Sequence, residues 1–336
     1  MRFPLARRAV LLAAGLLGAG LLGAGLLGAS TLAPVLPAGV ATAAARPAAT
    51  APSPPGKGTG RFVLALGDSL AAGYQPVYGH RLPPLDPVDQ LRDQGYPHSY
   101  AADVAKRLGL GLVDLGCPGE TTLSFTTRPA MGPCTTLYRT AYSAPNQQAA
   151  ALAVIASHPG KIALVTFDLG ANDVDACLAG GSLNDACVLN KALAVIHRLP
   201  KIVATIHAAL AKADPGAPMV AMDYYDPFLG LAIRPGGAKG LALATASLGA
   251  LEGFNAELRR VYGEQHVRVA HVASAFDTTG TFPLSRVDAK TVPKDVAFVC
   301  RHTYMCPSSP TVPQDIHPNN AGYALIATAF MKALRP

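Results

Sequence analysis

Residues 61–69 read RFVLALGDS, an apolar run that ends in a glycine turn. A short, unbroken apolar run of this kind is typical of a strand that is buried on both faces of a sheet. Similar runs recur further along the chain, at residues 111–115, 162–167, 219–223 and 267–272. We therefore expect five strands of one buried sheet.

Longer segments with helical periodicity separate these runs, at residues 99–108, 147–157, 188–212, 241–262 and 321–333. In the first of them, Tyr100, Val104 and Leu108 fall on one face. Strands that alternate with helices predict right-handed crossovers and a parallel sheet covered on both sides. The predicted fold class is α/β, a three-layer α/β/α sandwich with a mainly parallel sheet.

The composition fits one large folded domain and argues against a nucleic-acid partner. The chain has 336 residues, of which 50% are hydrophobic and 15% charged. Residues 1–60 carry five basic side chains and no acidic one, which leaves 23 basic and 21 acidic side chains in the remainder. No cluster of Lys and Arg marks a face that would bind nucleic acid.

The first 60 residues have the features of an export signal followed by a linker. Arg2, Arg7 and Arg8 precede an apolar run over residues 9–29, and an Ala-Thr-Ala site follows at residues 41–43. This pattern predicts a signal peptide at residues 1–45 and secretion to the outside of the cell. Because the run is long enough to span a bilayer, an uncleaved anchor remains the alternative.

A linker and the folded domain follow this leader. Residues 46–60 are rich in Ala, Pro, Thr, Ser and Gly and predict a flexible segment. The folded domain is then expected at residues 61–336.

Six cysteines lie after the leader, and an exported protein with an even number of cysteines is expected to form disulfides. Their spacing in the sequence favours the pairs Cys117–Cys134, Cys177–Cys187 and Cys300–Cys306. Metal binding is the alternative, but no Cys-x-x-Cys pair or Cys–His cluster has the spacing of a zinc site. We expect no metal ion and no cofactor.

Polar turns follow the first three predicted strands, where ligands bind in parallel sheets. These turns contain Ser69, Gly119 and Asn172. A serine at this place is often a helix cap, and glycine and asparagine are common in ordinary turns. Residue 71 is Ala, so the sequence lacks the Gly-x-Ser-x-Gly elbow of α/β-hydrolases. His317 lies in a Pro- and Asn-containing loop before the last predicted helix.

Taken together, four short blocks resemble the SGNH (GDSL) hydrolase superfamily. They occur in the order Gly67-Asp68-Ser69-Leu70, Gly119-Glu120-Thr121-Thr122, Gly170-Ala171-Asn172-Asp173 and Asp315-Ile316-His317-Pro318-Asn319. The resemblance covers about residues 61–336 and extends to secreted actinobacterial esterases and lipases, which often carry three disulfides. It implies a flavodoxin-like sheet.

The resemblance also implies roles for four residues. Ser69 would attack an acyl carbonyl, and His317 would remove the serine proton and later return it to the leaving alcohol. The backbone N–H groups of Ser69 and Gly119 and the side-chain amide of Asn172 would form the oxyanion hole.

The acid of the triad departs from the family pattern. The family usually places it three residues before the histidine, and this position is Gln314. Asp315 lies only two residues before His317. Either the Asp315 carboxylate or the Gln314 side-chain carbonyl could accept the Nδ1 proton of His317 and fix its tautomer.

The sequence thus predicts a secreted, monomeric serine hydrolase that cleaves small-molecule or lipid carboxylic esters through an acyl-enzyme, without stable membrane insertion once the leader is removed. A phospholipase or a carbohydrate acetylesterase on the same fold is an alternative. An inactive exported binding protein is another. The long segments at residues 74–96, 122–146, 224–239 and 277–314 are expected to be loops that set the substrate preference.

Overall fold

The computed structural model describes residues 60–78, 98–127, 143–177, 184–234, 236–278, 284–287, 289–307 and 311–335. All of the described residues belong to one compact unit. The predicted signal peptide and all but the last residue of the predicted linker lie outside the described residues. Their boundaries remain predictions.

Five parallel strands form the main sheet, in the order β2-β1-β3-β4-β5. Their bounds are β1 Phe62–Leu66, β2 Gly111–Asp114, β3 Ile162–Phe167, β4 Met219–Met222 and β5 Arg268–Ala270. This is the strand order of flavodoxin-like folds. All five residues of β1 are completely buried, as a central strand covered on both faces requires. The predicted fold class is confirmed.

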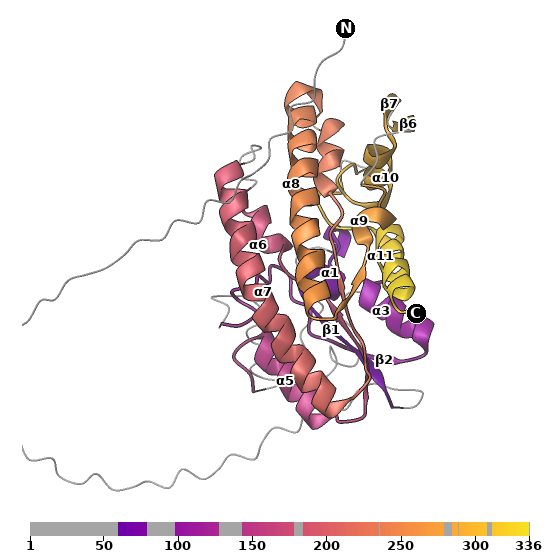
Figure 1. Ribbon diagram of the computed structural model, residues 1–336. Coiled ribbons are helices and arrows are strands. Elements are labelled where there is room, and N and C mark those ends of the chain that lie inside the picture. The colour runs from indigo at the N-terminus through magenta and orange to yellow at the C-terminus, as the bar shows by residue number, and fades with distance from the viewer. Residues whose placement is uncertain are drawn as a thin grey trace, which may run out of the picture. The chain divides into compact units, whose positions relative to one another are not determined.

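Helices cover both faces of this sheet (Figure 1). On one side α3 packs against α11, and on the other α7 packs between α5 and α8. The bounds of these helices are α3 Tyr100–Leu108, α5 Gln147–Ser157, α7 Asp185–Ala213, α8 Gly237–Glu264 and α11 Asn320–Ala333. They coincide closely with the periodic segments of the sequence, because each helix buries an apolar stripe on the sheet.

Shorter elements complete the fold. They are α1 Ser69–Ala72, η1 Pro76–Tyr78, α6 Ala171–Asp175, η2 Pro227–Ala232, α9 Val272–Ala275, β6 Leu284–Val287, β7 Lys290–Pro293 and α10 Lys294–His302. Five of them (η1, η2, β6, β7 and α10) lie in segments that were expected to be loops. Strands β6 and β7 form an antiparallel hairpin. Side chains of η2 and α10 build a second, smaller apolar core, which includes Leu229 and Val299. The prediction of loops for residues 224–239 and 277–314 is therefore wrong in part.

Among the described residues, one helix is long and apolar enough to cross a membrane by length and composition alone. This helix is α7, and a third of its most apolar window is buried inside the fold. Its contacts with α5, α6 and α8 make it part of the helical layer. This packing accounts for the buried part of its apolar surface, whereas Leu189 and Leu193 of the same helix are exposed.

A carboxyl group at the end of β2 makes the stability of the fold depend on pH. Asp114 Oδ1 accepts a hydrogen bond from the Gly116 N–H at 2.8 Å, while its Oδ2 is buried without a partner among the described residues. Burial raises the pKa of Asp114 to about 8. Between about pH 4 and this value, the folded state holds a proton that the unfolded state has lost. The free energy of unfolding therefore falls as pH rises through this window.

Asp114→Asn is expected to stabilise the protein at alkaline pH, because the amide can keep the bond to Gly116 and carries no charge. The gain in Tm should be larger at pH 9 than at pH 5, by about 4 °C or more. Thermal unfolding followed by circular dichroism at both pH values measures this difference. Asp185→Asn, at an exposed position, is the matched control. An equal change in Tm at the two pH values would show that ionisation of Asp114 does not destabilise the fold.

Candidate active site

Ser69 lies where β1 passes into α1, at the carboxyl edge of the sheet. It is the first residue of α1, which Asp68 caps by accepting a hydrogen bond from the Leu70 N–H at 2.9 Å. Gly67 has a φ of +142°, and a Cβ placed on it would lie 1.9 Å from Asp168 Oδ1. Only glycine therefore permits this turn. The serine side chain is 7% exposed.

Two buried carboxyl groups, those of Asp68 and Asp168, lie beside the turn that carries Ser69. The Asp68 N–H donates to Asp168 Oδ1 at 2.7 Å. Burial raises the pKa of Asp168 to about 7. Burial, and then the charge of Asp168, raise the pKa of Asp68 well above its usual range. Because Asp168 is completely buried, water does not compete for the hydrogen bond that it accepts from the Asp68 N–H. This bond fixes the backbone directly before Ser69.

The loop that carries His317 is anchored on several sides. The Tyr304 N–H donates to the carbonyl of His317 at 3.0 Å, and the Tyr225 hydroxyl donates to the carbonyl of Ile316 at 2.7 Å. Asn319 caps α11 through the N–H of Gly322. These contacts hold the loop over the start of α1.

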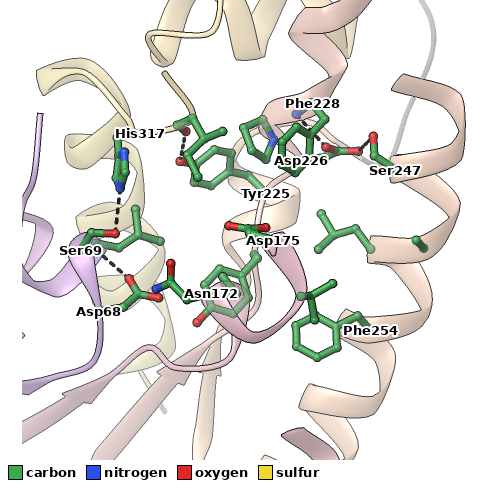
Figure 2. Close-up of a pocket in the computed structure, with 18 of the residues that line it drawn as sticks. Asp68, Ser69, Asn172, Asp175, Tyr225, Asp226, Phe228, Ser247, Phe254 and His317 are labelled. Atoms are coloured by element: carbon green, nitrogen blue, oxygen red, sulfur yellow. Dashed lines mark hydrogen bonds between the residues drawn. The ribbon is translucent and has the colours of Figure 1, made fainter. Parts of the chain in front are cut away.

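Ser69 and His317 meet although 248 positions separate them in the chain. His317 Nε2 lies 2.7 Å from Ser69 Oγ (Figure 2). His317 Nδ1 lies 2.5 Å from Asp315 Oδ1, which also accepts the backbone N–H of His317 at 2.9 Å. The three side chains form a continuous line of hydrogen bonds from hydroxyl to imidazole to carboxylate.

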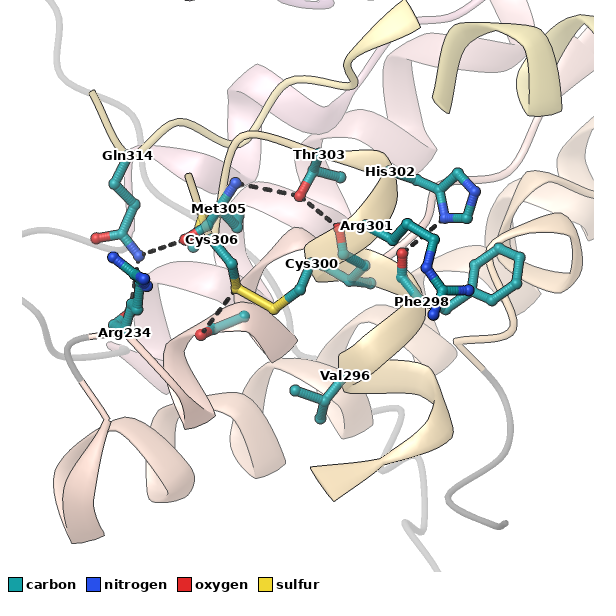
Figure 3. Close-up of a disulfide and its surroundings, with 12 residues drawn as sticks. Arg234, Val296, Phe298, Cys300, Arg301, His302, Thr303, Met305, Cys306 and Gln314 are labelled. Carbon is teal, nitrogen blue, oxygen red and sulfur yellow. Dashed lines mark hydrogen bonds between the residues drawn. A yellow bond between two sulfur atoms is a disulfide. The ribbon is translucent and has the colours of Figure 1, made fainter. Parts of the chain in front are cut away.

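Gln314 points away from this line. Its Nε2 donates to the carbonyls of Arg234 at 2.7 Å and Met305 at 2.9 Å (Figure 3). Of the two acceptors left open by the sequence, the structure brings Asp315 to the imidazole and places Gln314 elsewhere. The close i to i+2 bond between the Asp315 side chain and the His317 N–H is an Asx-type turn, which directs the carboxylate back towards its own loop.

The three predicted oxyanion donors also gather here. Asn172 lies at the start of α6, and its Nδ2 donates to the Glu120 carbonyl at 3.0 Å, which ties α6 to the turn that contains Gly119. Gly119 has a φ of +83°, a conformation that favours glycine. The N–H of Ser69 is in the first turn of α1, where helix geometry provides no acceptor.

Two further side chains hold the donors in place and were missed by the sequence reasoning. The Gln147 side chain bonds both to the N–H of Gly67, at 2.7 Å, and to its carbonyl, at 2.9 Å, and also donates to Glu120 at 3.1 Å. Asp173 accepts the N–H and the hydroxyl of Thr122, each at 2.8 Å. Nothing in the local sequence marks Gln147, because its role depends on a turn 80 positions away.

Two of the three predicted disulfides are present among the described residues. Cys177–Cys187 joins the segment after α6 to the first turn of α7, and Cys300–Cys306 joins α10 to the turn that bonds the His317 loop (Figure 3). Cys134 lies outside the described residues, so the pair predicted for Cys117 is not described. Both observed bridges close loops near a predicted site residue.

A pocket with a volume of about 90 Å³ opens beside Ser69. Most of its wall is apolar or aromatic, which is typical of small-molecule sites. Besides Ser69, Asn172 and His317, it is lined by residues that the sequence did not single out, including Asp175, Tyr225, Asp226, Phe228, Ser247 and Phe254. Tyr225 and Asp226 follow β4 closely, so the rule that located Ser69 and Asn172 also applied to them.

The arrangement provides a hydroxyl beside an imidazole, donors for an anion and an apolar pocket. Such a set suits the addition of the serine oxygen to a carbonyl carbon. In the part of the chain that the structure describes, no three His, Cys, Asp or Glu side chains lie close enough together to hold a metal ion.

Comparison of the sequence with models of known protein families identifies the family to which it is similar. Residues 65–325 match the model of the GDSL-like lipase/acylhydrolase family. A search of functionally curated proteins finds no match.

Similar solved structures include the extracellular lipase from Streptomyces rimosus, with 18% identity, coverage of 81% of this chain and 99% of that chain, and a TM-score of 0.47. Phospholipase A1 from Streptomyces albidoflavus has 18% identity, coverage of 82% and 98%, and a TM-score of 0.46. The acetylxylan esterase Axe2 from Geobacillus stearothermophilus has 14% identity, coverage of 82% and 94%, and a TM-score of 0.43.

Proposed function

Because the chain belongs to the GDSL-like lipase/acylhydrolase family, we propose that it is a hydrolase of carboxylic esters that uses Ser69 as its nucleophile. The membership confirms the resemblance read from the four sequence blocks. The observation that carries the proposal is the distance of 2.7 Å between His317 Nε2 and Ser69 Oγ.

In the first half of the reaction, His317 takes the hydroxyl proton as Ser69 Oγ attacks the ester carbonyl carbon. The carbonyl oxygen becomes an oxyanion. When this intermediate collapses, the bond to the leaving oxygen breaks, and His317 gives its proton to the alcohol. Water then attacks the acyl-serine, with His317 again as the base, and as the bond to Ser69 Oγ breaks, His317 returns the proton to this oxygen and the carboxylic acid leaves.

The oxyanion would be held by the N–H groups of Ser69 and Gly119 and by the amide of Asn172. One such donor can lower the barrier by about 2.7–4 kcal/mol. The bond from Asn172 to the Glu120 carbonyl supports this role, because it fixes the amide while one of its two N–H groups is available to the substrate.

Asp315 would keep His317 in the tautomer that has its proton on Nδ1 and would stabilise the imidazolium formed during attack. Its position 2.5 Å from Nδ1 supports this role. A neutral Gln314 would stabilise that charge less, and its amide is already bonded to two backbone carbonyls.

We also propose that the protein is exported, with residues 1–45 as a signal peptide. The disulfides Cys177–Cys187 and Cys300–Cys306 support export, because such bonds persist in oxidising compartments. The substrate is proposed to be a small-molecule or lipid ester, and the apolar wall of the pocket supports an organic group of moderate size.

A fluorophosphonate that reacts with activated serines tests the proposal directly. We expect one label per protein molecule, located on Ser69 by peptide mass spectrometry. Ser247 is an internal control, because it lines the same pocket but donates its hydroxyl to Asp226 at 2.9 Å. Absence of labelling would favour a binding protein that has lost turnover, and labelling of Ser247 would assign the nucleophile to a different serine.

A further inference from the structure

The wall of the pocket opposite the catalytic line carries a carboxyl group that the proposed mechanism does not use. Asp175 ends the short helix α6 and projects into the pocket (Figure 2). No hydrogen bond or ion pair reaches its carboxyl group from the described residues. Burial, and then the charge of Asp226, raise the pKa of Asp175 to about 7. Asp175 is half-buried, so its carboxyl group can be reached by a ligand in the pocket, and a positively charged group there would pair with it.

Asp226 places a second carboxyl group, fully buried, in the wall of the same pocket. One of its oxygens accepts the Ser247 hydroxyl and the other accepts the Phe228 N–H, each at 2.9 Å. Burial raises the pKa of Asp226 to about 7 as well. No Lys or Arg is among the described residues that line the pocket, so nothing there neutralises the two carboxyl groups. A positively charged ligand would favour the ionised form of both.

The rest of the wall suits an organic cation rather than a metal ion. Tyr225, Phe228 and Phe254 line the pocket around the carboxyl groups (Figure 2). Aromatic faces attract ammonium groups, and they do so best where water is excluded. Among the described residues, no three His, Cys, Asp or Glu side chains of this wall lie close enough together to hold a metal ion, whereas an ammonium group would find both charge and aromatic contact.

The spacing along α6 sets how far the cation lies from the reacting bond. Asn172 and Asp175 are one helical turn apart, so their Cβ atoms are about 5–6 Å apart on the same face. A substrate whose carbonyl oxygen meets Asn172 would therefore bring a group two to four bonds further along to Asp175. This is the length of a short aliphatic linker.

We propose that the pocket selects esters of small organic cations, with a quaternary or primary ammonium group two to four bonds from the ester, and that Asp175 is the specificity-determining residue. The inference rests on the proposed ester hydrolysis. It adds the chemical class of the substrate to that activity.

A pair of neutral and charged molecules of equal shape tests the inference. Choline and 3,3-dimethylbutan-1-ol differ in a single atom, nitrogen or carbon, and each can be measured as a competitive inhibitor of p-nitrophenyl acetate hydrolysis. At pH 8.5, where the Asp175 carboxyl group is ionised, choline is expected to inhibit the wild-type protein at least about tenfold more strongly than its neutral counterpart. Equal inhibition would overturn the inference.

Asp175→Asn keeps the size of the side chain and removes its charge. The ratio of the two inhibition constants should fall to about threefold or less in this variant, and remain at the wild-type value in Asp185→Asn, which removes an exposed charge outside the pocket. A ratio that is unchanged in Asp175→Asn would assign the selectivity to another group. If the variant does not fold, the wild-type ratio still decides the question.

Binding of the same two alcohols is also measured by saturation-transfer NMR, which needs no turnover. If the protein binds choline selectively but cleaves no ester, the proposed function is wrong, while the inference that the pocket prefers organic cations is retained. If it cleaves p-nitrophenyl acetate but does not discriminate between the two alcohols, the proposed function stands and the inference is wrong.

Discussion

Ser69→Ala is expected to lower kcat for p-nitrophenyl acetate by about 10⁴- to 10⁶-fold. Without Oγ, no acyl-enzyme forms, and only the oxyanion donors and substrate binding remain to accelerate hydrolysis by water. The change removes one buried oxygen whose partner is the His317 imidazole. The fold should therefore be retained, which circular dichroism can verify.

Ser157→Ala is the matched control for this experiment. Ser157 is an exposed serine at the end of α5, away from the pocket, and its replacement should leave kcat within twofold of the wild-type value. Steady-state kinetics with p-nitrophenyl esters of several chain lengths give the comparison. Equal rates for the wild type and Ser69→Ala would end the assignment of Ser69 as nucleophile.

Asp315→Asn is expected to lower kcat by about 10²- to 10⁴-fold. The amide can still accept from the backbone N–H of His317, but it cannot stabilise the imidazolium with a full charge, and it permits the wrong tautomer of His317. KM should change much less than kcat, because Asp315 contacts the imidazole and does not line the pocket. Kinetics with p-nitrophenyl acetate separate the two parameters.

Gln314→Ala distinguishes the two candidate acceptors for His317. It removes the bonds from the Gln314 amide to the carbonyls of Arg234 and Met305, so some loss through loop position is expected, of about tenfold at most. A larger loss in kcat for Gln314→Ala than for Asp315→Asn would reverse the assignment of the acid.

The sheet and the long helices could be predicted from sequence because their signals are local. Phe62–Leu66 is apolar at every position, and a central strand of a parallel sheet needs nothing else to be recognised. The amphipathic spacing in Tyr100–Leu108 likewise depends only on the helix itself. Both elements were found within one or two residues of their observed bounds.

The elements that were missed depend on distant partners. The hairpin β6–β7 and helix α10 are short, and the apolar residues of α10 become a core only when η2 packs on them. The sequence around Val299 shows no sign of that contact. Short segments of this kind resemble loops until their tertiary partners are known.

The candidate site divides in the same way. Ser69, Asn172 and His317 lie in turns that follow strands or precede the last helix, so both the sheet-edge rule and the family resemblance marked them. Asp175 lies only one helical turn beyond Asn172, yet its importance comes from a pocket whose opposite wall is formed by η2 and α8. Site residues that lie in turns next to strands could be predicted from the sequence. Asp175 could not, because its position in the site is defined only by the shape of the folded pocket.

The distance in sequence between Ser69 and His317 has a consequence for biosynthesis. A ribosome that has just added the serine must add another 248 residues before the imidazole exists. In the folded protein, α11 packs beside the site, and its Tyr323 hydroxyl donates to the Tyr74 carbonyl at 2.7 Å. The proposed hydrolytic activity therefore requires the chain to be synthesised at least as far as His317 and folded so that its imidazole reaches Ser69.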